Sequence, residues 1–239
     1  MKYPFYRTMV ENTSTSQKED VHLYQGGAFT AAGAKDLYDD WVGTYDDTLK
    51  EWGYPGPRKV AETLMDFGYG GEQKTPVRVL DLGCGTGLSG EALKEAQIGC
   101  KNLVGVDISP KSIELLKKEK PGLYSEAYAG NLDSKLDNFL QTDDFDVVVC
   151  VGVMSYIENF ASLYSEVLRV SHTGAVFAFT QQPVFWDSDA RQTRSEAEKL
   201  EQEGTWKCES ISESMAYLPE SPDEETKKKQ IKIFVYRKL

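Results

Sequence analysis

Short apolar runs alternate with amphipathic stretches through the middle of the chain. The apolar runs are residues 77–82 (VRVLDL), 102–108 (NLVGVDI), 123–130 (LYSEAYAG), 145–153 (FDVVVCVGV) and 174–180 (GAVFAFT). The stretches between them carry apolar residues at helical spacing, and they cover residues 88–96, 110–120 and 159–170. Buried strands separated by helices predict a parallel sheet with helices on both faces.

The end of the chain departs from this alternation. Residues 188–204 predict a helix, and residues 206–218 and 229–239 predict two strands joined by a polar loop. In the last segment Ile231, Ile233 and Val235 alternate toward one side, as they would in an antiparallel pair. We therefore expect a reversed strand at the C-terminus.

Two segments precede the sheet. Residues 11–20 are polar, and we expect residues 1–20 to form a flexible N-terminal extension. Residues 21–75 predict a helical cap or lid, because aromatic and apolar side chains recur on one face of residues 35–50 and a second stripe follows Pro57. Residues 76–239 then form the sheet domain.

Composition narrows the class of protein. The chain has 239 residues, 40% of them hydrophobic, which is enough for one large domain with a full core. Its net charge of −11, without clusters of Lys or Arg able to neutralise a phosphate backbone, disfavours nucleic acid as a partner. No apolar stretch approaches the roughly 18 residues of a membrane span, and no secretory signal is evident. The four cysteines are widely spaced, so we expect reduced thiols, no metal site and a cytoplasmic location.

A glycine-rich turn follows the first predicted strand. Residues 79–90 read VLDLGCGTGLSG and contain Asp81, Gly83, Gly85 and Gly87. Glycine costs backbone entropy unless a special conformation or a close approach requires it, and ligands of open α/β sheets bind beyond the carboxyl ends of the strands. We interpret the turn as a small-molecule site, since an ordinary tight turn would need one glycine.

The spacing of the turn indicates which ligand binds. Dinucleotides are recognised by G-x-G-x-x-G, whereas this turn has G-x-G-x-G, which disfavours an NAD-linked oxidoreductase. Asp81 would repel a pyrophosphate but suits a cationic group such as an ammonium. Asp107 ends the second strand, where a carboxylate can accept hydrogen bonds from ribose hydroxyls. A nucleoside with a cationic substituent fits both positions, and this predicts S-adenosylmethionine (SAM).

These motifs resemble those of the class I SAM-dependent methyltransferases. VLDLGCGTG resembles the first motif of that family, VGVDIS the second, and FDVVVCVGVMSYI the motif of the fourth strand. AGNL (129–132) places Asn131 where the family usually has an acid that faces the adenine amino group. The resemblance runs from Val77 to the C-terminus. It implies a Rossmann-like, mostly parallel sheet of seven strands with a reversed C-terminal strand.

The segment before the sheet narrows the resemblance. YDDWVGTYDD (38–47) and WGYPGP (52–57) are similar to segments of the Williams–Beuren syndrome region methyltransferase-like proteins. In those proteins the corresponding segment helps to cover the cofactor. The resemblance therefore implies a covering role for Tyr38 and Tyr45. Burial on an amphipathic helix explains Tyr45 equally well, and it is the preferred reading for Trp41.

The resemblance also implies a set of site residues. The implied cofactor-binding residues are Tyr38, Tyr45, Asp81, Gly83, Cys84, Gly85, Gly87, Asp107, Ile108, Asn131, Leu132 and Val151. The implied catalytic residues are Tyr156, which lines the acceptor pocket, and Tyr45. His22 is a further candidate, as a general base, because it lies in the N-terminal segment that could reach the site. Tyr24, Trp186 and Trp206 are further candidates for that lining, although a core role also explains each. We expect His172 to be a capping or surface residue.

The chemistry of methyl transfer explains why no acid–base constellation is found. A sulfonium is already an activated donor, and proximity alone can supply roughly 7–11 kcal/mol. Sequence signatures for methylating exocyclic amines of bases, cytosine or arginine are missing, so we expect a small-molecule acceptor. Two alternatives remain open: a SAM-binding regulatory or scaffold protein without catalysis, and a protein or RNA methyltransferase.

Overall fold

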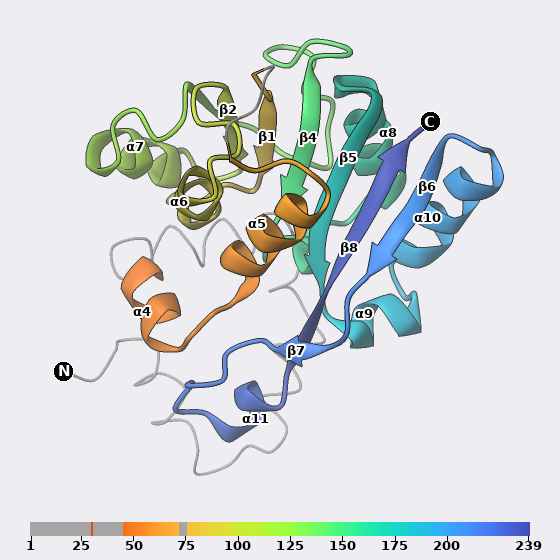
Figure 1. Ribbon diagram of the computed structural model, residues 1–239. Helices are drawn as coiled ribbons and strands as arrows, with labels where there is room; N and C mark the ends of the chain where they lie inside the picture. Colours follow the sequence, from red (N-terminus) through yellow and green to blue (C-terminus); the bar gives the residue numbers. More distant parts are fainter. Residues whose placement is uncertain (1–29, 31–44, 72–75) are drawn as a thin grey trace.

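The computed structural model describes residues 30, 45–71 and 76–239 (Figure 1). The helices are α4 (Tyr45–Glu51), α5 (Gly56–Asp66), α6 (Leu88–Glu95), α7 (Pro110–Glu119), α8 (Phe160–Val170), α9 (Pro183–Ser188), α10 (Thr193–Gln202) and α11 (Glu224–Lys227), with a 3-10 turn η1 at Met154–Tyr156. The strands are β1 (Val79–Leu82), β2 (Leu103–Asp107), β3 (Glu126–Ala129), β4 (Phe145–Cys150), β5 (Ser171–Gln181), β6 (Trp206–Ile211), β7 (Met215–Ala216) and β8 (Gln230–Lys238).

The strands form one twisted sheet in the order β3-β2-β1-β4-β5-β8-β6 (Figure 1). Neighbours from β3 to β5 are parallel, and β8 runs antiparallel to both β5 and β6. The two-residue β7 pairs with the start of β8 as an eighth strand. This arrangement confirms the predicted Rossmann-like α/β fold with a reversed C-terminal strand.

Two hydrophobic layers lie on the two faces of the sheet. Helices α5, α6 and α7 cover one face, and α8, α9 and α10 cover the other (Figure 1). In β5, Val176 and Ala178 belong to the first layer, whereas Phe177 and Phe179 belong to the second. Because side chains alternate between two buried faces, the strand is apolar at successive positions.

The predicted helix at residues 188–204 is wrong over its first turn. The structure has two helices there, α9 and α10, and Asp189 and Gln192 between them have positive φ values of 50° and 63°. The Asp189 carboxylate accepts hydrogen bonds from the backbone N–H groups of Arg194 (2.8 Å) and Ser195 (3.2 Å). A short acidic side chain that bonds local backbone groups competes with helix continuation, which explains the break.

The predicted strand at residues 206–218 is also interrupted. It divides into β6 and β7, and Ser212 lies between them. The Ser212 hydroxyl donates to the carbonyl of Glu213 (2.8 Å) and accepts from the backbone N–H of Ile233 (2.9 Å). The side chain thus replaces part of the regular ladder with β8.

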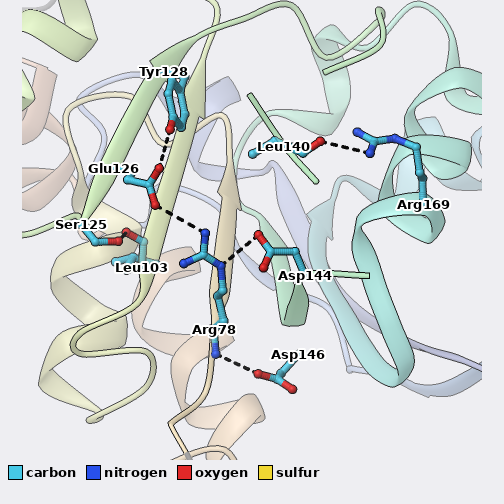
Figure 2. A network of polar contacts seen from close by, with 9 residues as sticks. All are labelled: Arg78, Leu103, Ser125, Glu126, Tyr128, Leu140, Asp144, Asp146 and Arg169. Carbon is cyan, nitrogen blue, oxygen red and sulfur yellow. Dashed lines mark hydrogen bonds and ion pairs between the residues drawn. The ribbon is translucent and has the colours of Figure 1, made fainter. Parts of the chain in front are cut away.

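Polar contacts join the strands at the edge where they begin (Figure 2). Nε of Arg78 lies 3.0 Å from Oδ2 of Asp144, and its Nη2 lies 3.4 Å from Oε1 of Glu126. The backbone N–H of Arg78 donates to Asp146 (2.9 Å), and the guanidinium lies over the ring of Phe145. These contacts fasten the amino ends of β1, β3 and β4 to one another. The loops that build the site follow the carboxyl ends of the strands, on the opposite side of the sheet.

Within the described ranges, no helix combines the length and apolar character that crossing a membrane requires. His172 lies at the start of β5 and is exposed, which confirms the expected surface position. None of the four cysteines takes part in a disulfide.

Candidate active site

A pocket of about 890 Å³, counting its open mouth, lies at the carboxyl ends of β1, β2 and β4. Nine of the sequence-predicted site residues line it: Gly83, Cys84, Gly85, Asp107, Ile108, Asn131, Leu132, Val151 and Tyr156. The lining also includes residues that the sequence analysis did not single out, among them Leu49, Tyr54, Thr86, Asp133, Gly152 and Val153. The predicted glycine turn and strand ends therefore come together at one pocket.

The three glycines of the turn are needed for different reasons. Gly83 has a φ of 76°, and a Cβ there would lie 2.2 Å from Cγ2 of Val153. Gly87 has a φ of 99° at the start of α6, and its Cβ would lie 2.7 Å from Cδ1 of Leu116. Gly85 has a φ of 50°, but no heavy atom lies within 4 Å of its Cβ position. Of the three, Gly85 is the one whose missing side chain leaves open space in the pocket.

Asp107 organises the turn. Its Oδ2 accepts from the backbone N–H of Gly85 (2.9 Å), and its Oδ1 accepts from the backbone N–H of Ser109 (2.8 Å). Ser109 in turn caps α7 by accepting from the N–H of Ser112. Since each carboxylate oxygen can accept more than one hydrogen bond, this placement suits a ribose diol as well as the turn.

Asp81 lies beneath the turn, and it is not among the residues that line the pocket. Its side chain is 0% exposed, and its Oδ2 accepts from the hydroxyl of Tyr124 at 2.6 Å. Burial raises the pKa of Asp81 to about 7, and the nearby Asp107 adds to this while Tyr124 opposes it. Its Oδ1 is buried and has no hydrogen-bond partner among the described residues. The contact with a ligand ammonium therefore stays a prediction, and Oδ1 is the atom that would make it.

The loop after β3 contains an acid that the sequence analysis missed. Oδ1 of Asn131 already accepts from the backbone N–H of Asp133 (2.9 Å). Asp133 lines the pocket, and its Oδ1 accepts from the N–H groups of Glu158 (2.9 Å) and Asn159 (2.8 Å). Its Oδ2 is buried without a hydrogen-bond partner in the described ranges. The signal in the sequence was an acid two residues beyond Asn131.

The predicted acceptor residues have different outcomes. Tyr156 lines the pocket from η1 and is half-buried. Trp186 and Trp206 belong to the hydrophobic layer under α8, and they do not line the pocket. Tyr45 begins α4, but its side chain lies outside what the structure describes. His22, Tyr24, Tyr38 and Trp41 also lie outside the described residues.

Helix α4 is attached to the glycine turn. The Thr86 hydroxyl donates to Oδ1 of Asp46, and Nζ of Lys120 lies 2.6 Å from Oδ2 of the same carboxylate. The side chains of Lys120 and Asp46 are 18% and 20% exposed, so solvent screens this pair only partly. Lys120 also reaches Glu91 in α6 at 3.1 Å. The described part of the predicted cap is thus bonded to the loop that borders the pocket.

Comparison with known proteins identifies the family. Residues 73–237 match a family model described as "Methyltransferase domain". The chain therefore belongs to this methyltransferase family. No curated protein sequence matches the chain.

Solved structures share the fold at low sequence identity. A TehB-like SAM-dependent methyltransferase from Corynebacterium glutamicum has a TM-score of 0.56 and 18% identity, and the match covers 83% of this chain and 98% of that one. A SAM-dependent methyltransferase from Mesorhizobium loti has a TM-score of 0.54 and 17% identity, with coverage of 74% and 98%. A geranyl diphosphate C-methyltransferase from Streptomyces coelicolor, in complex with Mg²⁺, geranyl diphosphate and S-adenosyl-L-homocysteine, has a TM-score of 0.56 and 16% identity, with coverage of 75% and 79%.

The family and the fold together define a class I SAM-dependent methyltransferase, an enzyme that uses SAM as its cofactor. The pocket fits this cofactor in three ways. Gly85 leaves open space beside the turn, Asp107 stands at the end of β2, and a buried carboxylate oxygen of Asp133 lacks a partner in the described structure. The described residues contain no group of three side chains suited to hold a metal ion.

Proposed function

We propose that the enzyme transfers the methyl group of SAM to a small-molecule acceptor by in-line displacement at the sulfonium. The observation that carries this proposal is the wall of the pocket beyond the cofactor-binding residues. That wall is mainly apolar and is built from α4, α5, the end of β4 and η1, with Leu49, Pro57, Val153 and Ile157 among its members. An apolar concave site with few polar groups is typical of small-molecule binding.

The residues of the chain have separate roles in this proposal. When bound, SAM supplies a methyl group activated by the positive sulfonium. Asp107 and Asp133 hold the nucleoside, while Val153 and Tyr156 orient the acceptor and exclude water. Burial holds the pKa of the Cys84 thiol well above its usual range, so this lining thiol is neutral and a poor nucleophile. This supports direct transfer to the acceptor.

The experiment that tests the proposal uses SAM with a labelled methyl group in a cell extract divided into small-molecule, protein and RNA fractions. We expect the enzyme to label the small-molecule fraction. Label confined to the protein or RNA fraction would support the macromolecular alternative. Tight binding of S-adenosylhomocysteine without any labelled product would support a SAM-binding protein that does not catalyse transfer.

We also propose that residues 21–75 cover the cofactor, as the similarity to the Williams–Beuren-like proteins suggests. The contacts of Asp46 with Thr86 and Lys120 support this, since they join α4 to the glycine turn. Asp46→Ala is expected to weaken binding of S-adenosylhomocysteine several-fold, because it removes the contacts with Thr86 and Lys120, and a partly screened ion pair contributes up to about 1 kcal/mol. Calorimetric titration measures the change. The neighbouring Asp47 is exposed, so Asp47→Ala is the matched control, and equal effects of both variants would contradict the attachment.

Asp133 is expected to recognise the adenine amino group through Oδ2. In Asp133→Asn this oxygen becomes an NH₂ donor, which opposes the adenine amino group but matches the oxygen of hypoxanthine. We therefore expect the variant to lose roughly 10-fold in its preference for S-adenosylhomocysteine over S-inosylhomocysteine, or about 1.4 kcal/mol. Calorimetric titration with both ligands measures this preference. If Asn131→Ala shifts it instead and Asp133→Asn does not, Asn131 is the recognising residue.

A further inference from the structure

The WGYPGP segment between α4 and α5 places a tyrosine in the pocket wall, and the site described so far gives it no role. The ring of Tyr54 is half-buried and packs edge-on against Tyr217, with 5.2 Å between ring centroids. Its hydroxyl oxygen is shielded from solvent and makes no hydrogen bond of normal geometry within the described ranges. A buried hydroxyl without a partner costs roughly 1–3 kcal/mol, so such a group calls for an explanation.

Two glycines far apart in the sequence make room for this phenol. A Cβ at Gly56 would lie 2.5 Å from the Tyr54 hydroxyl, and a Cβ at Gly152 would lie 3.0 Å from it. Gly56 is not among the glycines with a positive φ, so its backbone does not itself require glycine. Glycine is required at this position because the Tyr54 side chain approaches so closely. The hydroxyl therefore lies close to both glycines, and the φ of 78° at Gly152 favours glycine there by itself.

The surroundings of the Tyr54 hydroxyl determine whether it donates or accepts a hydrogen bond. The backbone N–H of Gly152 donates to Oγ1 of Thr180 at 2.8 Å, which leaves the Thr180 proton to be donated. Thr180 and Tyr54 do not reach full hydrogen-bond geometry, and Thr180 offsets only part of the effect that burial has on the pKa of Tyr54. Burial outweighs this and raises the pKa, so the phenol keeps its proton at neutral pH. The Tyr54 hydroxyl can therefore donate a hydrogen bond to a ligand.

The hydroxyl stands on the acceptor side of the pocket. Gly152 follows β4 and Asp107 ends β2, and β1 lies between these strands. Strands are about 4.8 Å apart, so the two positions are roughly 10 Å from each other. Within the described lining, the charged residues are Asp107 and Asp133, both negative, which disfavours an anionic acceptor.

We propose that Tyr54 selects the methyl acceptor by donating a hydrogen bond to an oxygen of a neutral, largely apolar molecule held beside Tyr156. The class of acceptor is then a neutral compound with a hydroxyl or carbonyl oxygen. The inference rests on the proposed small-molecule reaction, since it assigns this side of the pocket to the acceptor.

The test uses the full chain saturated with S-adenosylhomocysteine and three probes of similar size: phenol, benzoate and benzylamine. Affinities are measured by nuclear magnetic resonance titration. We expect phenol to bind more tightly than the anionic benzoate or the cationic benzylamine. Tyr54→Phe is expected to weaken phenol binding roughly 3- to 10-fold and to leave the affinity for S-adenosylhomocysteine unchanged.

Two further variants sharpen the result. Gly56→Ala keeps the hydroxyl but displaces it, so it should weaken phenol binding as Tyr54→Phe does. Tyr128→Phe is the matched control, because it removes a hydroxyl that bonds Glu126 at the far edge of the sheet. Tyr128→Phe should change neither the affinity for phenol nor the affinity for S-adenosylhomocysteine.

Unchanged phenol affinity in Tyr54→Phe would overturn the role of Tyr54, and tighter binding of benzoate or benzylamine to the wild type would overturn the class of acceptor. Labelling in the cell extract reports separately on the small-molecule reaction. A failure of that reaction is thereby distinguished from a failure of this inference.

Discussion

Gly85→Ala is expected to weaken binding of S-adenosylhomocysteine roughly 10- to 100-fold, since a methyl group forced into a filled site costs about 1–3 kcal/mol. No protein atom lies within 4 Å of the Cβ position of Gly85, so the new methyl group would not enter the core, and Gly85 is a residue of the pocket lining. The fold should survive with a loss of about 1–2 kcal/mol, because a φ of 50° is unfavourable for alanine. Calorimetric titration and denaturant unfolding measure the two effects.

Gly204→Ala is the matched control. Gly204 also has a positive φ, 69°, and no atom within 4 Å of its Cβ position, but it lies between α10 and β6 and does not line the pocket. The two variants should lose similar stability, and only Gly85→Ala should lose cofactor affinity. Equal affinities in both would show that the open space at Gly85 is not where the cofactor lies.

Asp81→Asn is expected to make the protein more stable at pH 8 and to remove part of its pH dependence. The pKa of Asp81 is raised from 3.8 to about 7. Between pH 4 and pH 7 the folded state therefore keeps a proton on this carboxyl group that the unfolded state has lost. The stability that this group contributes is present below about pH 4 and is lost as the pH rises through 7. The resulting change in the free energy of unfolding is at most about 4 kcal/mol. Denaturant unfolding between pH 4 and 8 measures it.

The control for this variant is Asp47→Asn, which removes an exposed carboxylate. Its unfolding free energy should follow the wild type across the range, whereas the profile of Asp81→Asn should be flatter. Parallel profiles for wild type and Asp81→Asn would mean that Asp81 does not retain a proton in the folded protein.

Ionisation of Asp81 should link binding of the cofactor to the release of a proton. An ammonium at Oδ1 would favour ionised Asp81, so binding of S-adenosylhomocysteine below pH 7 should release protons from the wild type and fewer from Asp81→Asn. Titration in buffers of different ionisation enthalpy measures the number released. Equal proton release by the two proteins would remove the ammonium contact from the proposal.

The alternation of apolar strands and helices is a local property of the chain, and most of the fold could be predicted from it. Residues 175–179 of β5 form a continuous apolar run because both faces of the sheet are covered. The glycine turn could be predicted as a ligand site for a similar reason, since its spacing is visible within nine residues. The breaks at Asp189 and Ser212 were not predicted, because one side chain bonding the backbone leaves no trace in the apolar pattern.

The roles of individual polar residues depended on contacts between distant segments. Asp81 and Asp107 have the same side chain near the same turn, yet one is buried against Tyr124 and the other lines the pocket. Their different burial follows from the strand order and from which face each residue occupies. Likewise, Tyr54 and Gly56 are neighbours in the sequence, but their proximity to Gly152 arises only when the loop after β4 meets the segment before α5. Local periodicity specifies the elements, whereas solvent access and side-chain partners arise from the packing of elements that are far apart in the chain.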